Sequence, residues 1–128
     1  MDKTVISSPS VPPRPGYSHA LRVGNLLFFA GQVARNARGE LVGKADIVAQ
    51  TRQAMDNLTA LLRAAGAGWE NVIKTNIYVT DMAAFRDATG QLRLSYSVPP
   101  YPASTLVEVK ALAHPDLMVE IEAIAVLG

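Results

Sequence analysis

The last part of the chain alternates side chains of two kinds at every second position, a pattern typical of β-strands. Within Tyr101 to Gly128, the two stretches that flank the sequence AHPD both follow it. We expect them to pair as an antiparallel hairpin in which Lys110 lies opposite Glu120 and Glu108 lies opposite Glu122. This register predicts three carboxylates and one amine together on a sheet face that is otherwise apolar. One interpretation of this patch is a functional site. The alternative is that the same four side chains form a salt-bridge network at an interface between subunits.

The rest of the chain predicts further strands and two helices. Apolar residues recur at three- and four-residue steps over 46–65, which indicates a long amphipathic helix. Gly31 lies within the apolar run LLFFAG, where a glycine suggests a bulge or a close approach by another backbone or a ligand. The remaining elements are expected as strands at 4–7, 19–23, 25–33 and 72–80, and as a helix at about 82–94.

The element order is therefore β-β-β-α-β-α-β-β, with no linker, and predicts a single α+β domain over residues 1–128. A sheet of about six strands is roughly 24 Å wide, and two helices each about 10 Å across cover only one face of it. Several strands nevertheless carry apolar residues on both faces. We therefore expect subunits that assemble through the sheet, covering Leu106, Leu112, Ile124 and Val126.

Composition excludes several classes of protein. The formal charge is +1 and the basic residues are scattered, which argues against a nucleic-acid groove. The chain has no cysteine, and its two histidines, His19 and His114, are too far apart in sequence to suggest a metal site. No apolar run approaches membrane-spanning length, and MDKTVISSPS lacks the apolar core of a signal peptide. A cytoplasmic protein without a membrane partner is the expectation.

With these elements placed, the segments at 15–33, 50–85 and 101–126 resemble the Rid family, also called YjgF or L-PSP. The most specific pieces are VEIEAIA near the C-terminus and QTRQ followed by NL in the first helix. The resemblance implies a chorismate-mutase-like subunit in a homotrimer, with clefts between neighbouring subunits. It also implies a small-molecule substrate: the best-known branch hydrolyses reactive enamines and imines such as 2-aminoacrylate, without metal or organic cofactor.

The resemblance also implies which residues form the site. Tyr17 matches a site tyrosine and Glu120 matches a site glutamate, so these two are the candidate catalytic residues. The substrate-binding arginine of the deaminases is absent, because PARS of that branch reads PAST here and places Ser104 at its position. The other positions that the resemblance assigns to substrate binding are Thr89 in place of an asparagine, Leu106 in place of a cysteine or serine, and His19 in place of a glutamine. Gly31 is added as a position that a ligand approaches.

The missing arginine changes what can be expected of the chemistry. A charged hydrogen bond contributes roughly 1.5–3 kcal/mol, so its loss would cost about one to two decades in binding or rate. Arg14, Arg35 or Lys110 could supply a replacement charge, while pairing with Lys110 would keep Glu120 ionised. His19 is equally readily explained as a hydrogen-bonded structural histidine.

Two functions therefore stand as hypotheses. The first is a hydrolase or deaminase of small enamines or imines with altered carboxylate recognition. The second is a small-molecule-binding trimer that has lost hydrolysis. The ribonuclease activity once ascribed to the family is disfavoured by the near-neutral charge and the absence of a paired-histidine site.

Overall fold

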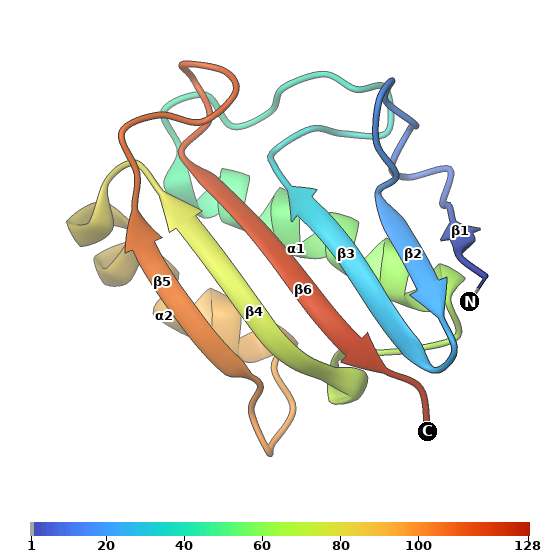
Figure 1. Ribbon diagram of the computed structural model, residues 1–128. Coiled ribbons are helices and arrows are strands. Elements are labelled where there is room, and N and C mark those ends of the chain that lie inside the picture. Colours follow the sequence, from blue (N-terminus) through green and yellow to red (C-terminus); the bar gives the residue numbers. More distant parts are fainter. Residues whose placement is uncertain (1) are drawn as a thin grey trace.

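The computed structural model describes residues 2–128 as one mixed sheet with two long helices packed behind it (Figure 1). The sheet has six strands in the order β1-β2-β3-β6-β4-β5. The two expected helices are confirmed, with the predicted element order. The bounds are β1 Thr4–Ile6, β2 Ala20–Val23, β3 Leu26–Gln32, α1 Ile47–Ala64, the 3-10 turn η1 Trp69–Asn71, β4 Val72–Val79, α2 Met82–Tyr96, β5 Ala103–Glu108 and β6 Val119–Val126.

Both helices begin where the sequence supplies an acceptor for their first free backbone N–H groups. Asp46 accepts from the backbone N–H of Ala49 at 3.0 Å, and Asp81 accepts from that of Ala84 at 3.0 Å. The first helix ends before Gly66, whose φ of +75° is the left-handed conformation that stops a helix.

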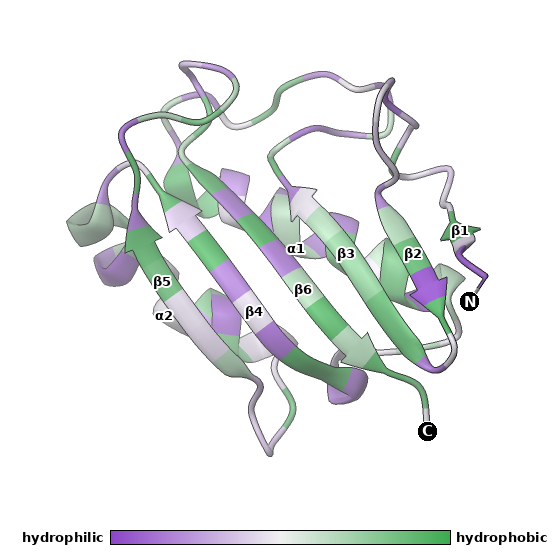
Figure 2. Cartoon of the chain, viewed as in Figure 1, coloured by the Kyte–Doolittle hydropathy of each residue, from purple (hydrophilic) through white to green (hydrophobic). Residues whose placement is uncertain are grey.

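The core lies between the helices and the covered face of the sheet. Leu58, Leu61 and Leu62 of α1 are fully buried, as is Phe85 of α2. The alternation predicted for β6 is confirmed, because every second residue from Val119 to Ala125 is buried. Figure 2 shows it as bands of hydrophobic and hydrophilic colour along the strand.

The predicted hairpin between the last two strands is wrong. The two strands are not neighbours, because β4 lies between them, parallel to β5 and antiparallel to β6. The unit β4-α2-β5 is a strand–helix–strand connection that places β5 at the edge of the sheet. Alternation along a strand shows which residues share a face, but it does not show which strand lies next to it.

The hairpin register also misplaced two side chains. Glu108 is level with Val79 in the sheet, on the helix side, where it accepts a hydrogen bond from the backbone N–H of Met82 at 2.9 Å. Leu106 is also on that side and packs against the core, so it needs no cover from another subunit. The three-carboxylate patch is thus reduced to Glu120 and Glu122.

The other sheet face is open within residues 2–128. Phe28 of β3 is 42% exposed and Val107 of β5 is 40% exposed on it. Within one chain, therefore, only one face of β3 is buried, since Leu27 and Phe29 face the core and Leu26 and Phe28 do not.

Candidate functional site

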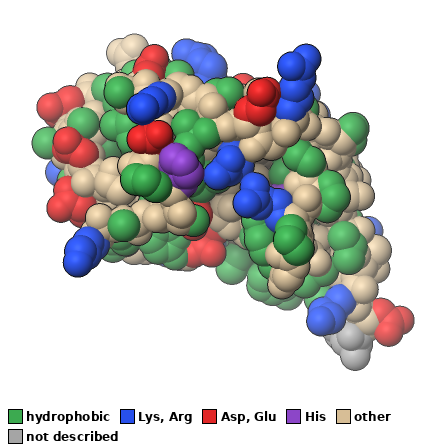
Figure 3. Space-filling view, turned by 90° about the horizontal axis from the view of Figure 1, so that it is seen from above, with side chains coloured by type: hydrophobic (Ala, Val, Ile, Leu, Met, Phe, Trp, Pro, Cys, Tyr) green, Lys and Arg blue, Asp and Glu red, His purple; other side chains and the backbone are tan. Residues whose placement is uncertain are grey.

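A cavity of about 490 Å³ lies at one end of the sheet, where the proline-rich loop before β2 meets the loops after β3 and before β6. Basic side chains gather on this end of the molecule when it is seen from above (Figure 3). The side chains of chemical interest around the cavity are Arg14, Tyr17, His19, Gln32, Arg35, Arg38, Asn57 and Glu120, and Gly31 completes the wall beside Glu120.

Glu120 projects from β6 into this cavity and is partly buried. Burial raises the pKa of its carboxyl group, and the negative charge of Glu122 raises it further. The carboxyl can approach the neighbouring strand closely because Gly31 has no side chain: a Cβ there would lie 2.7 Å from three atoms of Glu120. The sequence predicted a bulge or a close approach by a backbone or a ligand at Gly31. The pairing of β3 with β6 does shift register between Phe29 and Gln32, but the group that comes close to Gly31 is the Glu120 side chain.

The expected ion pair between Lys110 and Glu120 is wrong. Lys110 is exposed in the loop after β5, and the one ion pair within residues 2–128 joins Lys44 to Asp116. Because Glu120 forms no ion pair within residues 2–128 and its burial opposes the charged form, it favours its protonated form more than an ordinary glutamate does. It is therefore suited to donate a proton as well as to accept one.

Tyr17 and His19 line the same cavity from the loop before β2. Their rings meet edge to face, with centroids 5.3 Å apart. Nε2 of His19 donates to the carbonyl of Pro12 at 2.9 Å, and Nδ1 accepts from the amide of Gln32 at 3.1 Å. Since a carbonyl can only accept, the proton is on Nε2 and both ring nitrogens are engaged. The ring acts in this structure as a brace that holds the loop and Tyr17.

Two of the candidate cations line the cavity, Arg14 and Arg35. Nη1 of Arg35 donates to the carbonyl of Gly39 at 3.0 Å, which fixes one branch of its guanidinium. The buried amide of Asn57 holds the backbone beneath it by donating to the carbonyls of Val33 at 3.2 Å and Arg35 at 3.0 Å. Positive charge next to Glu120 and Tyr17 favours a small anionic ligand.

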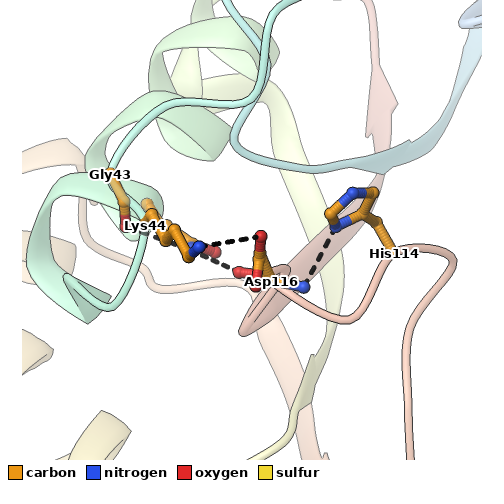
Figure 4. A network of polar contacts seen from close by, with 5 residues as sticks. Gly43, Lys44, His114 and Asp116 are labelled. Carbon is orange, nitrogen blue, oxygen red and sulfur yellow. Dashed lines mark hydrogen bonds and ion pairs between the residues drawn. The ribbon is translucent and has the colours of Figure 1, made fainter.

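The wall formed by the loop before β6 is tied to the start of α1 (Figure 4). The buried Gln50 amide donates to the carbonyls of Gly43 at 3.1 Å and Asp116 at 2.8 Å, and its oxygen accepts from the backbone N–H of Met118 at 2.8 Å. Lys44 lies 3.9 Å from the carboxylate of Asp116, whose backbone N–H donates to Nδ1 of His114 at 3.0 Å. This network sets the direction in which β6 enters the sheet, and hence the position of Glu120.

Glu122 is held on the open face, two residues further along β6. It accepts hydrogen bonds from the hydroxyl of Tyr78 and from the amide of Asn76, the latter at 3.2 Å. The hydrogen bond to Glu122 is the main cause of a raised pKa of Tyr78, followed by burial. These two hydrogen bonds hold the Glu122 side chain in place, two residues from Glu120 on the same strand.

The remaining predicted substrate-binding residues lie elsewhere. Ser104 lines a second cavity, of about 560 Å³, between α2 and β5, whose lining shares no residue with that of the first. Thr89 is fully buried, and its hydroxyl donates to the carbonyl of Phe85 at 2.6 Å. Leu106 is packed on the core. One subunit therefore brings together Tyr17, His19, Gly31 and Glu120 but not Ser104.

The sequence interpretation missed several residues that line these cavities, namely Gln32, Arg38, Asn57 and Arg93. Arg93 had a local signal, because it follows Thr89 by one helical turn and so shares its face of α2. Gln32 and Asn57 had none, since their partners come from distant parts of the chain.

Within residues 2–128, no group of three or more His, Cys, Asp or Glu side chains could hold a metal ion, and neither helix is long and apolar enough to cross a membrane.

Comparison with known proteins places this arrangement in a family. Residues 8–127 match the family model described as Endoribonuclease L-PSP. The chain belongs to this family. A RutC family protein of Pyrococcus horikoshii is 42% identical over 125 residues, covering 96% of this chain and 97% of the relative. The 2-iminobutanoate/2-iminopropanoate deaminase of Escherichia coli K12 is 34% identical over 129 residues, covering 98% of both chains.

Solved structures of the L-PSP family, also called Rid or YjgF, share the fold. The Rid family protein YyfA of Yersinia pestis superposes with a TM-score of 0.90 at 33% identity, covering 98% of this chain and 100% of its own. The YjgF gene product of E. coli superposes with a TM-score of 0.82 at 32% identity, covering 96% and 98%. The predicted family and α+β fold are thereby confirmed.

Proposed function

We propose that this L-PSP family protein hydrolyses small enamine or imine metabolites, with a mode of carboxylate recognition that differs from that of the arginine-bearing deaminases. For 2-aminoacrylate, a proton is added to the methylene carbon to give the imine. Water then adds to the imine carbon and the C–N bond breaks, releasing ammonia and a 2-keto acid. Each step moves only protons, water and ammonia, so the reaction needs acid–base groups and no redox partner.

The observation that carries this proposal is the environment of Glu120. Its carboxyl has a raised pKa in a cavity that also holds the Tyr17 hydroxyl and several guanidinium groups. A carboxyl in this state can protonate the substrate carbon or nitrogen and can then accept a proton from the attacking water. Tyr17 orients the substrate, and the nearby arginines favour a negatively charged one.

The names of relatives support the same substrate class. The E. coli relative and one of Dermatophagoides farinae, 33% identical over 126 residues, are both called 2-iminobutanoate/2-iminopropanoate deaminase. Their substrates are imines of short 2-keto acids, which a cavity of a few hundred cubic ångströms accommodates.

The proposal includes a homotrimer with clefts between its subunits. Glu120 and Ser104 line different cavities of one chain, so a substrate that touches both positions needs them to come from neighbouring subunits. The open sheet face, with Leu26 and Phe28 37% and 42% exposed, is the surface through which we expect the subunits to meet. That surface also carries Glu122 and Tyr78, which would form the polar part of the interface.

The test is release of ammonia and 2-keto acid from freshly generated 2-aminoacrylate, compared with buffer. We expect acceleration by the wild-type protein and a loss of about 10²- to 10⁴-fold in the Glu120→Gln variant. Glu70→Gln is the matched control, since Glu70 is an exposed glutamate in η1 that lines neither cavity. No acceleration by wild type at high protein concentration would refute the proposal, as would a Glu120→Gln variant as active as the control.

The second candidate function is a non-catalytic trimer that binds small molecules. It is favoured by Ser104, whose hydroxyl accepts a hydrogen bond from Thr75 at 2.9 Å and brings no charge to the position of the lost arginine. Binding of 2-keto acids without any acceleration of imine hydrolysis would support this candidate over the first.

A further inference from the structure

The cavity between α2 and β5 contains a feature that the family resemblance does not assign. Its floor is apolar, formed by residues such as Met55, Ile77 and Ile121, and its rim carries hydroxyl groups and one guanidinium, that of Arg93. The combination of a small apolar floor with a few convergent polar groups is typical of a ligand site.

Arg93 is held firmly by its neighbours. Its Nε donates to the hydroxyl of Thr89 at 3.1 Å, and its Cζ lies 4.5 Å from the centre of the Phe85 ring, in a cation–π contact. Since both Thr89 and Phe85 are fully buried, the guanidinium is positioned by the core rather than by solvent-exposed side chains. A guanidinium restrained in this way loses little freedom when it binds a ligand.

This positive charge has no counter-ion in the described chain. The one ion pair within residues 2–128 is between Lys44 and Asp116, and the hydrogen bond to Thr89 is the only one made there by the Arg93 guanidinium. Burial lowers the pKa of Arg93, and the charge of Arg86 lowers it further. A partly buried cation that is hydrogen-bonded only through Nε keeps both Nη groups available as donors.

Ser104 adds a second donor to the same cavity. Its oxygen accepts from the Thr75 hydroxyl at 2.9 Å, which leaves its own O–H free to donate. A forked guanidinium and a hydroxyl on one rim match the two oxygens of a carboxylate, while the apolar floor suits a short alkyl group.

We propose that Arg93, together with Ser104, binds the carboxylate of a short aliphatic carboxylic acid and so replaces the arginine that other family members carry at position 104. The identification of this acid as the substrate rests on the proposed function, whereas its binding does not. In those members the arginine is on the strand that corresponds to β5, whereas in this chain the cation is on α2, which lines the same cavity. Thr89 is then a positioning residue for Arg93 rather than a contact for the substrate.

The test is binding of pyruvate to the intact protein, measured by calorimetry and by amide shift perturbation. We expect wild type to bind pyruvate with shifts in α2 and β5, and Arg93→Gln to bind it about 10- to 100-fold more weakly. Arg93→Lys, which keeps the charge but loses the fork, should fall between them. Arg63→Gln, on the exposed side of α1, is the matched control and should bind like wild type.

Thermal melts of each variant show whether lost binding reflects lost folding. Pyruvamide, which lacks the negative charge, should bind wild type and Arg93→Gln equally weakly. Equal pyruvate affinity of Arg93→Gln and wild type would overturn the inference, as would tighter binding of inorganic phosphate than of pyruvate. If Arg93→Gln and Arg93→Lys both fail to fold, the wild-type protein alone decides. Pyruvate-induced amide shifts confined to the Glu120 cavity would then overturn the inference.

The same variants separate this inference from the proposed function. Pyruvate binding that depends on Arg93, without any imine hydrolysis, would leave the inference standing and refute the function. Imine hydrolysis with the same KM in Arg93→Gln and wild type would support the proposed function and refute Arg93 as the group that binds the carboxylate of the substrate. A raised KM with a largely retained kcat in Arg93→Gln would support both.

Discussion

The carboxyl group of Glu120 occupies the space that a side chain on Gly31 would need. A Cβ at position 31 would lie 2.7 Å from Cγ, Cδ and Oε2 of Glu120, against 3.4–4 Å for ordinary contacts. The two residues come from neighbouring strands, β3 and β6, at the point where their register shifts. The absence of one methyl group on β3 therefore decides where the candidate catalytic carboxyl points.

A Gly31→Ala substitution is expected to displace Glu120 and to lower imine turnover as strongly as Glu120→Gln does. Overpacking of this kind also costs about 1–3 kcal/mol of stability, which a urea titration would measure. Gly90→Ala makes the same chemical change within α2, where an added Cβ meets nothing within 4 Å. It should instead stabilise the protein by about 0.5–1 kcal/mol. A Gly31→Ala variant with wild-type turnover would contradict the tight fit described above.

The raised pKa of Glu120 predicts a pH-dependent effect of Glu120→Gln on stability. The folded protein binds this proton more tightly than the unfolded chain, so the stability that the group contributes is complete below its ordinary pKa of 4.5 and is lost as pH rises through the higher folded value. The variant has no charge to bury. Its Tm should exceed that of wild type at pH 7, and this difference should shrink as the pH falls to about 4. A difference that grew toward acidic pH would show that the carboxyl is stabilised as an anion.

Gln50 is expected to be the most important polar residue for the geometry of the cavity wall. Gln50→Leu would leave the carbonyls of Gly43 and Asp116 and the N–H of Met118 without their partner. We expect a loss of about 3–5 kcal/mol of unfolding free energy, since each buried unsatisfied group costs about 1–3 kcal/mol and part of that is recovered by relaxation. Lys44→Ala, which removes only the exposed ion pair to Asp116, should change stability by less than about 1 kcal/mol. Equal losses in the two variants would contradict this ranking.

Phe28→Glu should separate the subunits of the proposed trimer without unfolding them. Phe28 is 42% exposed on the open sheet face, so its replacement costs the single subunit little, whereas three buried charges at an interface would be costly. Light scattering after size-exclusion chromatography should give the mass of a monomer for this variant, and imine turnover should fall with it. Ala88→Glu, which adds the same charge on the exposed side of α2, should keep the wild-type mass. A wild-type protein with the mass of a monomer would remove the basis of this prediction.

Local patterns predicted most of the secondary structure. The helix at 46–65 and the caps at Asp46 and Asp81 follow from side-chain spacing and from the acceptors that helix ends need, both of which are local properties. The alternation in β6 correctly assigned Glu120 and Glu122 to one face. The resemblance to the Rid family then selected Tyr17 and Glu120 as candidates, and these two line the same cavity.

Pairing between strands could not be read in the same way. Alternation assigned faces within the last two strands, but it is silent on whether they are neighbours, and β4 separates them. The predicted partners of Glu120 and Glu108 were therefore wrong. Lys110 lies in a loop, and Glu108 binds the start of α2.

By itself, the sequence determined the helices and strands, because these depend on residue types at short spacings. Its resemblance to the Rid family determined which carboxyl group was the candidate, that of Glu120. Only the tertiary structure decided that Glu120 has a raised pKa and that His19 uses both nitrogens as a brace. It also decided that Arg93, a cation without an ion pair among residues 2–128, lines the same cavity as Ser104. These properties arise from contacts between segments far apart in the chain, where burial and hydrogen-bond partners set the behaviour of each group.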